Sequence, residues 1–240
     1  MLKKFFVVLG IVSGILAHDI HRLHGETSEL IAFDAEQGPE LLLTSGYRCD
    51  YWHLIKFFDT QHTKTYCGVA SGIMVLNAIK SEKPKVERFG CNRLFTQEEH
   101  FFTEEVSAIV TEEDVKVRGI RLEEMAEAMR TFDLDTTLYY GSDLDGDAFR
   151  SLLKSVLRSD KKFIIANYHR ETLGQKGGGH YSPIAAYNEV EDAVLILDVS
   201  RYRFPPIWVK VDRLLTSMQA IEQGRNLSRG ILVIADTRSR

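Results

Sequence analysis

The segment QHTKTYCGVASGIMVLNAIK, residues 61–80, places a cysteine at the start of an apolar run. Cys67 can act as a nucleophile there, because the unpaired N–H groups and the dipole at a helix N-terminus favour the thiolate. Gly68 keeps the space beside the sulfur open. A small buried side chain in a core helix is the commoner environment for an isolated cysteine. The chemistry of Cys67 therefore depends on the partners that the fold brings to it.

Three further side chains have the chemistry that a nucleophilic cysteine needs. His180 follows a run of glycines at the start of an apolar strand, and its imidazole can accept and return a proton. Asp198, in the run AVLILDV, can orient that imidazole, because a carboxylate in an apolar strand is costly to bury without a partner. Gln61 and the backbone N–H of Cys67 can stabilise the oxyanion of an acyl transfer. This combination predicts acyl transfer or hydrolysis at Cys67.

The first half of the chain contains the elements that must position Cys67. Helical spacing of apolar side chains predicts three helices, at residues 66–79, 121–132 and 147–159. In the first of these, Val69, Ile73 and Leu76 share a face, which predicts that this face is buried while Cys67 faces a cleft. Asp147 is expected to cap the third helix.

After about residue 160 the chain changes to short apolar runs bounded by turn residues. These runs predict four strands, at residues 162–168, 180–187, 193–199 and 230–235. NEVED, residues 188–192, is typical of a hairpin turn, which would pair the strand of His180 with the strand of Asp198. Pro205 and Pro206 predict a rigid turn that interrupts a strand.

Helices followed by an antiparallel sheet predict an α+β domain. A helical N-terminal lobe would pack on a β-sheet lobe, with the active site in the cleft between them. No linker rich in proline or glycine divides the chain, so residues 18–240 are expected to form a single domain. With 44% hydrophobic and 27% charged residues, the composition is that of a soluble globular protein. The formal net charge of -4 at pH 7 gives no reason to expect nucleic acid as a partner.

Residues 1–17 differ from the rest of the chain. Lys3 and Lys4 precede an apolar run from Phe5 to Ala17, which is too short for a helix that spans a bilayer. This pattern predicts a signal peptide cleaved after Ala17 and export to the periplasm or beyond, with no stable membrane span after cleavage. An uncleaved anchor and a buried N-terminal helix are the alternatives.

The other two cysteines and an N-terminal histidine cluster each allow more than one interpretation of their role. In an oxidising compartment Cys49 and Cys91 could form a disulfide that leaves Cys67 free, or they could supply soft ligands for cadmium or zinc. Unrelated reduced thiols are the alternative. The sequence HDIHRLH, residues 18–24, spaces its histidines so that two of them could hold a metal on one helix face. The favoured reading of that segment is an exposed stretch without a metal.

The order Gln61, Cys67, His180, Asp198 resembles that of the papain-like cysteine peptidases, with aspartate in place of the usual asparagine. The surrounding motifs resemble one branch more closely, the phytochelatin synthase family. They are TYCGVASGIMVLNAI at 65–79, NYHR at 167–170, GGGHYSPIAAYN at 177–188, LILDVSRYRFPPIWV at 195–209 and SRG at 228–230. The resemblance covers roughly residues 40–237, and the block that begins with HYSPI and ends with the PP-IWV segment is highly specific.

The resemblance implies a papain-like fold and cleavage of the Cys–Gly bond of glutathione. Cys67 would be the nucleophile that forms a γ-glutamylcysteinyl thioester. His180 would be the general base and acid, Asp198 would orient it, and Gln61 would donate to the oxyanion. The acyl group would pass to water, giving γ-glutamylcysteine, or to another glutathione, giving phytochelatin. Similarity to the short bacterial form favours hydrolysis.

The resemblance also implies a substrate-binding set of Arg170, Arg229, Glu222 and Gly179. Glutathione has two carboxylates, and a guanidinium binds a carboxylate through two hydrogen bonds. Glu222 suits the α-ammonium group of the γ-glutamyl end. Ordinary surface ion pairs are the alternative for the charged members of this set.

No tightly bound cofactor and no protein-bound metal is expected. Cadmium and zinc would enter as glutathione thiolate complexes, in heavy-metal detoxification. A homodimer is possible, and the sequence does not determine the oligomeric state. Two other functions are alternatives: a papain-like or bacteriocin-leader peptidase that cleaves other glycine-containing peptides, and a non-catalytic exported protein that binds thiols or metals. The intact set of Gln61, Cys67, His180 and Asp198 argues against the non-catalytic alternative.

Overall fold

The computed structural model describes residues 30–236 except 88, 89, 91 and 160. The expectations for residues 1–17 and 18–24, and those that involve Cys91, lie outside these described residues. Within them the chain is α+β: a seven-stranded antiparallel sheet carries helices on both faces. The same residues contain no helix that is both long enough and apolar enough to cross a membrane.

The sheet has the strand order β1-β6-β5-β4-β3-β7-β2, and every neighbouring pair is antiparallel. Its strands are β1 (Ile31–Ala32), β2 (Leu134–Tyr140), β3 (Lys162–His169), β4 (Gly179–Asn188), β5 (Ala193–Ile196), β6 (Ile207–Lys210) and β7 (Gly230–Asp236). The four predicted strands correspond to β3, β4, β5 and β7. Both β3 and β4 lie inside the sheet and are buried on both sides, which explains their continuous apolar sequences. The edge strands β1 and β2 and the short β6 were not predicted.

The helices are α1 (Gln37–Thr44), α2 (Cys49–Leu54), α3 (Cys67–Ile79), α4 (Glu104–Ile109), α5 (Glu112–Arg118), α6 (Leu122–Thr131), α7 (Gly146–Leu157), α8 (Arg170–Leu173) and α9 (Val211–Gln219), with short 3-10 turns at Ile55–Phe57 and Gly141–Asp143. The three predicted helices are confirmed as α3, α6 and α7. The predicted cap of α7 is wrong: Asp145, not Asp147, is the N-cap, and its carboxylate accepts from the N–H of Ala148 at 2.7 Å. The backbone of Asp147 is already helical, so its carboxylate cannot act as the cap.

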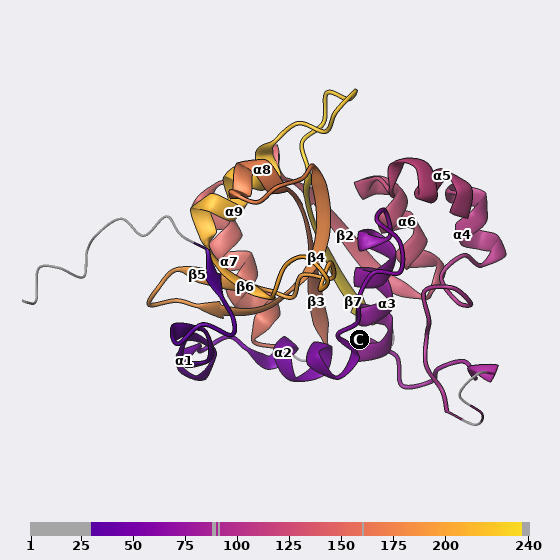
Figure 1. Cartoon of the computed structure of the whole chain (residues 1–240), viewed down its shortest axis with the longest axis horizontal. Coiled ribbons are helices and arrows are strands. Elements are labelled where there is room, and N and C mark those ends of the chain that lie inside the picture. The colour runs from indigo at the N-terminus through magenta and orange to yellow at the C-terminus, as the bar shows by residue number, and fades with distance from the viewer. Residues whose placement is uncertain (1–29, 88–89, 91, 160, 237–240) are drawn as a thin grey trace, which may run out of the picture.

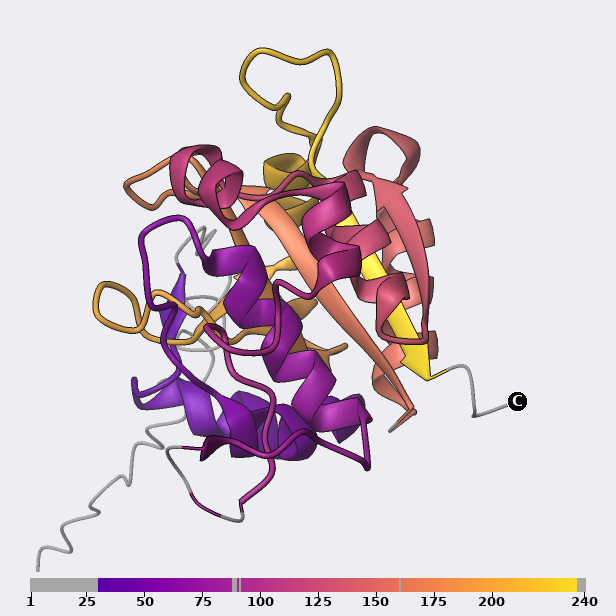
Figure 2. The same ribbon diagram turned by 90° about the vertical axis from the view of Figure 1, so that its right-hand side faces the viewer.

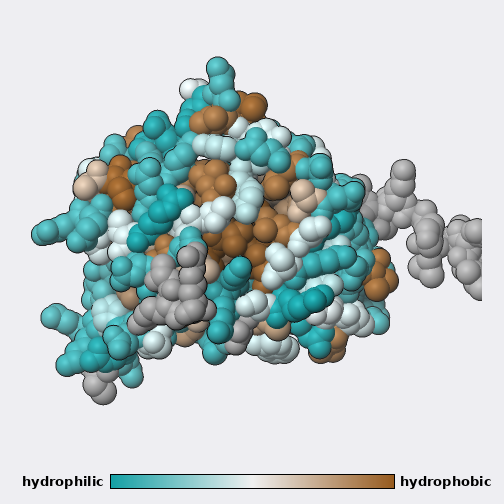
Figure 3. Space-filling model, turned by 180° about the vertical axis from the view of Figure 1, so that it is seen from behind, coloured by the Kyte–Doolittle hydropathy of each residue, from teal (hydrophilic) through white to brown (hydrophobic). Residues whose placement is uncertain are grey.

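The sheet divides two apolar cores (Figure 1). Helices α3–α6 pack on one face, where Met74, Met125 and Phe163 are fully buried. Helices α7 and α9 pack on the other face, where Phe149 and Leu214 are fully buried. Seen from behind, the surface is mostly hydrophilic, with apolar side chains gathered in a central hollow (Figure 3). Helix α3 is buried all round from Cys67 to Asn77, not along one face as its sequence predicted. It packs against α2 and the sheet, and Met125 and Met129 of α6 lie next to its Gly72.

Two connections bear on the site. Strand β5 ends at Ile196, earlier than the predicted residue 199, and its register with β4 shifts between Ile184 and Ala186. The chain nevertheless stays beside β4, since the N–H of Leu197 donates to the carbonyl of Pro183 at 3.0 Å. The second connection is the loop over residues 220–229, which stands beyond the end of the sheet near α5 and α6 (Figures 1 and 2).

Candidate active site

Cys67 is the first residue of α3 and its side chain is 9% exposed. The side chain of His180 and the backbone N–H groups of Tyr181 and Gly68 act on the sulfur and lower the pKa of the thiol. Gly68 allows a close approach on this side, because a Cβ there would lie 2.3 Å from Cγ2 of Ile120. The predicted position of Cys67, at a helix start and beside a histidine, is therefore what the structure contains.

His180 and Asp198 lie side by side and are both buried. Nε2 of His180 is 2.9 Å from Oδ1 of Asp198, which leaves Nδ1 for the sulfur of Cys67. His180 is fixed by strand β4, and its ring meets the ring of Tyr168 on β3 edge to face, with centroids 5.6 Å apart. Asp198 lies just beyond the end of β5, and its Oδ1 also accepts from the N–H of Ser200 at 2.8 Å. The hairpin prediction thus placed these two residues correctly, although Asp198 lies outside the strand.

The electrostatics of these three groups favour charge separation. Burial raises the pKa of the Cys67 thiol, but the imidazole of His180 and the two backbone N–H groups outweigh it, and the net pKa is lowered. Burial lowers the pKa of His180, but Asp198 and Cys67 outweigh that effect and raise it. Burial likewise raises the pKa of Asp198, whereas His180 and Arg170 pull it down to about 2. A thiolate beside an imidazolium, with a carboxylate behind, is the protonation state that this arrangement stabilises.

Arg170 lies behind Asp198 and not in the cavity described below. Its Nη1 is 2.8 Å from Oδ2 of Asp198, its Nη2 is 2.9 Å from Oδ1, and it also donates to Gln175. The guanidinium stacks on Phe204, 4.3 Å from the ring centroid. The guanidinium of Arg170 is therefore used in holding the carboxylate of Asp198, and the substrate role expected for it stays a prediction.

Gln61 is buried next to the segment that contains Asp198. Its backbone N–H donates to the carbonyl of Val199 at 2.9 Å, and its Oε1 accepts from the hydroxyl of Ser200 at 2.6 Å. Its Nε2 donates to the carbonyl of Thr63 at 2.6 Å, which leaves one N–H of the amide for a further acceptor. Ser200 thus links Gln61 and Asp198, and it orients the amide so that the nitrogen is the donor.

The sulfur of Cys67 opens on a cavity of about 430 Å³. The residues that line it are Cys67, Arg118, Gly119, Ile120, Arg121, Asn167, Gly179, Tyr181, Glu222, Gln223, Gly224, Arg225 and Arg229. Four of them are arginines and one is a glutamate, so the cavity wall is cationic. This composition favours a small polar ligand with carboxylate groups.

The sheet side of the cavity is formed by Arg229, Asn167 and Gly179. Nη1 of Arg229 donates to Oδ1 of Asn167 at 3.1 Å, while its buried Nε has no hydrogen-bond partner among the described residues. Burial lowers the pKa of Arg229, and the opposite effect of the Glu222 carboxylate offsets this lowering only in part. A Cβ on Gly179 would lie 2.3 Å from Nη1 of Arg229, so only glycine leaves room for this guanidinium. Arg229 and Gly179 are therefore placed where a carboxylate ligand could meet them.

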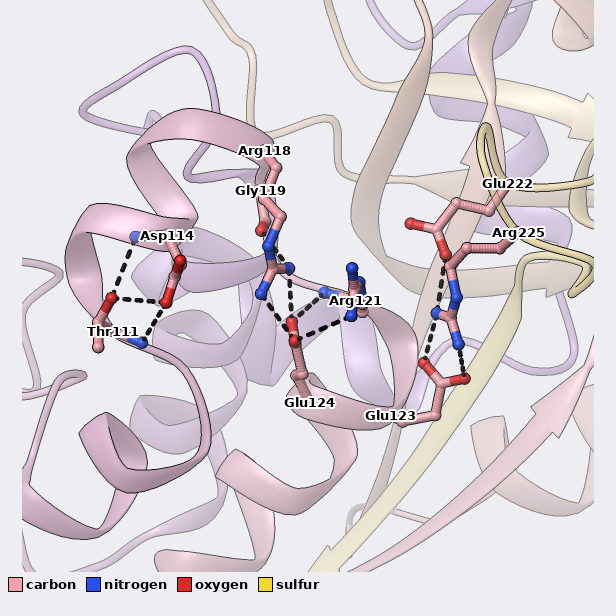
Figure 4. Close-up of polar contacts among 9 residues, drawn as sticks. All are labelled: Thr111, Asp114, Arg118, Gly119, Arg121, Glu123, Glu124, Glu222 and Arg225. Carbon is pink, nitrogen blue, oxygen red and sulfur yellow. Dashed lines mark hydrogen bonds and ion pairs between the residues drawn. The ribbon is translucent and has the colours of Figure 1, made fainter.

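Glu222 lies on the loop over residues 220–229 and faces the same cavity. Its carboxylate is 3.0 Å from Nη1 of Arg225, and Arg225 in turn pairs with Glu123 on α6 at 2.8 Å (Figure 4). This chain of ion pairs ties the loop to the helical part of the molecule. Glu222 keeps a second carboxylate oxygen for a cationic group of a ligand.

Within the described residues, no group of three or more His, Cys, Asp or Glu side chains is arranged to hold a metal ion. Cys49 is an exposed free thiol in α2, and its proposed partner Cys91 lies outside the described residues. The disulfide and the soft-metal alternatives thus stay predictions.

Several residues of the site were missed from the sequence. Asn167 has a recognisable signal, a lone amide within the apolar run KFIIANY, because a buried amide needs a partner. Tyr181 contributes its backbone N–H, a role that no side-chain pattern reveals. Arg118, Arg121 and Arg225 look like surface charges in the sequence, and only the tertiary fold brings them to the cavity.

Comparison with known proteins gives a consistent result. A family model described as phytochelatin synthase matches residues 24–231. Glutathione gamma-glutamylcysteinyltransferase 1 of Lotus japonicus is 31% identical over 208 residues, which are 85% of this chain and 40% of that protein. Glutathione gamma-glutamylcysteinyltransferase 2 of Arabidopsis thaliana is 31% identical over 207 residues, covering 86% of this chain and 44% of that protein. Glutathione gamma-glutamylcysteinyltransferase of Schizosaccharomyces pombe is 27% identical over 209 residues, covering 86% of this chain and 49% of that protein. The chain thus spans between two fifths and one half of the length of these curated relatives.

Proposed function

The chain belongs to the phytochelatin synthase family, and from that premise we propose that it cleaves the Cys–Gly bond of glutathione through a thioester on Cys67. The observation that carries this proposal is the buried Cys67–His180–Asp198 arrangement, which opens on a cationic cavity of about 430 Å³. The relatives are named as glutathione gamma-glutamylcysteinyltransferases, which supplies the substrate and the acyl group. The papain-like arrangement of helix, sheet and cleft is part of the same proposal.

In the acylation step the thiolate of Cys67 attacks the carbonyl carbon of the Cys–Gly bond, and a C–S bond forms. The oxyanion accepts from the backbone N–H of Cys67 and from the free N–H of Gln61, a type of donor whose loss typically costs about 10²–10³ in rate. His180 then gives its proton to the glycine nitrogen, the C–N bond breaks, and glycine leaves. Asp198 keeps the imidazole oriented throughout, and Arg170 holds Asp198 in place.

In the second step the acceptor is water or the amino group of another glutathione. His180 takes the acceptor's proton, the acceptor attacks the thioester carbonyl, and the C–S bond breaks to return the thiolate of Cys67. The products are γ-glutamylcysteine or phytochelatin. Cadmium and zinc enter this scheme as glutathione thiolates, which makes the metal a part of the substrate.

The γ-glutamyl end has two charged groups to place. Its α-carboxylate would meet Arg229, whose buried Nε is unpartnered, and its α-ammonium group would meet Glu222. Gly179 leaves the space that Arg229 occupies. One end of the substrate thus has a positive and a negative partner on the cavity wall.

The test mixes the purified full chain with glutathione and follows glycine, γ-glutamylcysteine and phytochelatin by mass spectrometry, with and without Cd²⁺. We expect glycine release from the wild type and a protein mass increased by one γ-glutamylcysteinyl group. Cys67→Ser should retain its circular dichroism spectrum and lose both signals. An inactive wild type, or a Cys67→Ser variant with near-normal turnover, would sink the proposal.

A further inference from the structure

The helical side of the cavity is a corner between α5 and α6 that contributes Arg118, Gly119, Ile120 and Arg121. Figure 4 shows Arg118 and Arg121 around Glu124 on this side, with Glu222 and Arg225 on the loop across from them. Neither the catalytic arrangement nor the proposed γ-glutamyl contacts use this corner. It is a cationic surface next to the reactive sulfur without an assigned role.

The arginines of the cavity differ in how far their hydrogen bonds are already used. Arg118 makes a two-pronged pair with Glu124, with both contacts at 2.8 Å. Arg225 pairs with Glu123 at 2.8 and 3.0 Å and with Glu222 at 3.0 Å. Both guanidinium groups are therefore committed to carboxylates of the chain itself.

Arg121 is different. Its shortest contact to a carboxylate is 3.8 Å, from Nη1 to an oxygen of Glu124 that already pairs with Arg118. The other oxygen of Glu124 accepts from the backbone N–H of Arg121 at 2.9 Å, which fixes the base of the side chain. The side chain is 46% exposed. Among the described residues that line the cavity, Arg121 thus combines a fixed backbone with a guanidinium whose two-pronged hydrogen-bonding edge is still available.

The unused edge of Arg121 points to an anionic ligand. Arg118 and Arg121 share the carboxylate of Glu124, and Asp114 acts on both arginines from a longer distance, but none of these carboxylates occupies the hydrogen-bonding edge of Arg121. The spare edge of a guanidinium matches the geometry of a carboxylate. Glutathione has a second carboxylate, on its glycine, and the first is already assigned to Arg229.

We propose that Arg121 binds the glycine carboxylate of glutathione and so selects substrates with a free C-terminal carboxylate after the scissile bond. The inference rests on the proposed function and adds to it the recognition of the leaving group. Glutathione would lie across the cavity, with its γ-glutamyl end at Arg229 and Glu222 and its glycine at the α5–α6 corner. Binding of both ends holds the Cys–Gly carbonyl at the sulfur of Cys67.

The experiment compares the full-length wild type with Arg121→Gln, Arg121→Lys and Lys154→Gln. Lys154 is a control for loss of one positive charge, because it lies on α7 on the opposite face of the sheet and pairs with Glu189. Each protein is assayed for cleavage of glutathione and of glutathione amide, in which the glycine carboxylate is replaced by a neutral amide. Arg121→Gln should lower kcat/KM for glutathione about tenfold, mainly through KM, and change it less than about twofold for the amide. Arg121→Lys should fall between, and Lys154→Gln should match the wild type.

Two results would overturn the inference. If Arg121→Gln keeps the kcat/KM of the wild type with glutathione, Arg121 makes no contact that contributes to glutathione cleavage. An equal loss with glutathione and its amide shows a structural role, or a contact to the other end of the substrate. Assay of 4-aminobutanoyl-Cys-Gly, which lacks the α-carboxylate, separates these two, since a loss that vanishes with this analogue assigns Arg121 to the γ-glutamyl end. An inactive wild type would contradict the proposed function itself, a result distinct from an active wild type with an unaffected Arg121→Gln.

Discussion

At the scale of single residues, the lowered pKa of Cys67 comes from groups that act against its burial. An apolar environment alone would hold the thiol protonated, as it does in an ordinary core cysteine. The imidazole of His180 and the N–H groups of Tyr181 and Gly68 reverse that effect. The same logic separates the two arginines first expected to bind substrate: Arg170 is neutralised by Asp198, whereas Arg229 is buried with an unpartnered Nε. Both residues are arginines, and the groups that each one contacts determine what it can bind.

The pH dependence of alkylation tests this balance. The thiolate of Cys67 should form at a lower pH than that of a free thiol, because its pKa is lowered. Removing the imidazole in His180→Ala leaves burial as the main influence, so the pKa should rise above the ordinary value and alkylation should need a higher pH. The rate of iodoacetamide labelling of the Cys67 peptide, followed by mass spectrometry between about pH 5 and pH 10, measures both midpoints. Equal midpoints in the two proteins would refute the assigned influence of His180.

At the scale of elements, the site depends on where helix α3 and strand β4 begin. Cys67 opens α3, so the free N–H of Gly68 is available to the sulfur. Gly179 opens β4, and the next residues deliver the ring of His180 and the N–H of Tyr181 to the same point. The first residues of α3 and β4 thus bring a thiol, an imidazole and free N–H groups together. Residues in the interior of either element could not do so, because packing would cover their side chains.

The glycines before His180 offer a matched pair of variants. A Cβ on Gly179 would lie 2.3 Å from Nη1 of Arg229, whereas a Cβ on Gly178 would meet nothing within 4 Å. Gly179→Ala should displace the guanidinium and lower kcat/KM for glutathione about tenfold, by loss of a charged hydrogen bond. Gly178→Ala should stay within about twofold of the wild type, since it changes only the flexibility of the loop. Steady-state glycine release measures both, and a Gly178→Ala defect as large as that of Gly179→Ala would contradict the steric explanation.

At the scale of the whole molecule, the site is a buried polar cluster between two apolar cores. The sheet separates those cores, and Asp198, with Arg170 and His180, lies at one end of it, cut off from solvent. Removing one member of such a cluster lowers the free energy of unfolding, because the remaining buried charges lose the opposite charge that compensates them. The proposed activity of this protein and its stability would therefore both depend on Asp198.

Acid unfolding should reveal that coupling. The pKa of Asp198 falls from an ordinary 3.8 to about 2 on folding, so its carboxylate stabilises the fold above about pH 4. About 2 kcal/mol of stability should be lost as the pH falls from about 4 to about 2, where the carboxylate becomes protonated in the folded state too. Asp198→Asn should lack this part of the pH dependence. It should also be about 3 kcal/mol less stable at pH 7, because Arg170 is left buried without its countercharge.

Urea unfolding followed by fluorescence at several pH values gives these free energies of unfolding. Asp147→Asn, which neutralises an exposed carboxylate on α7, is the matched control and should keep the full acid transition. If Asp198→Asn unfolds with the pH profile of the wild type, the ionised carboxylate does not contribute as described.

The sequence by itself determined the parts of this protein that depend on local pattern. Buried strands such as β3 and β4 have continuous apolar sequences, and α3, α6 and α7 have apolar residues at helical spacing. The types and approximate bounds of these elements were therefore predictable. The hairpin between β4 and β5 then made His180 and Asp198 neighbours without any tertiary information. The edge strand β2 was missed, because only one of its faces is well buried and its apolar signal is weak.

Only the tertiary structure decided which charges meet. Arg170 could bind substrate or Asp198, and its sequence context is the same in both cases. Arg225 lies 102 residues from Glu123, and no local pattern encodes that pair. The cavity is likewise built from separate segments of α3, the α5–α6 corner, the sheet and the loop over residues 220–229. Local preferences determine whether each segment is a helix, a strand or a loop. The ion-pair partners, in contrast, follow from the packing of the whole chain. For this reason only the tertiary structure identifies Arg121 as a candidate substrate-binding residue.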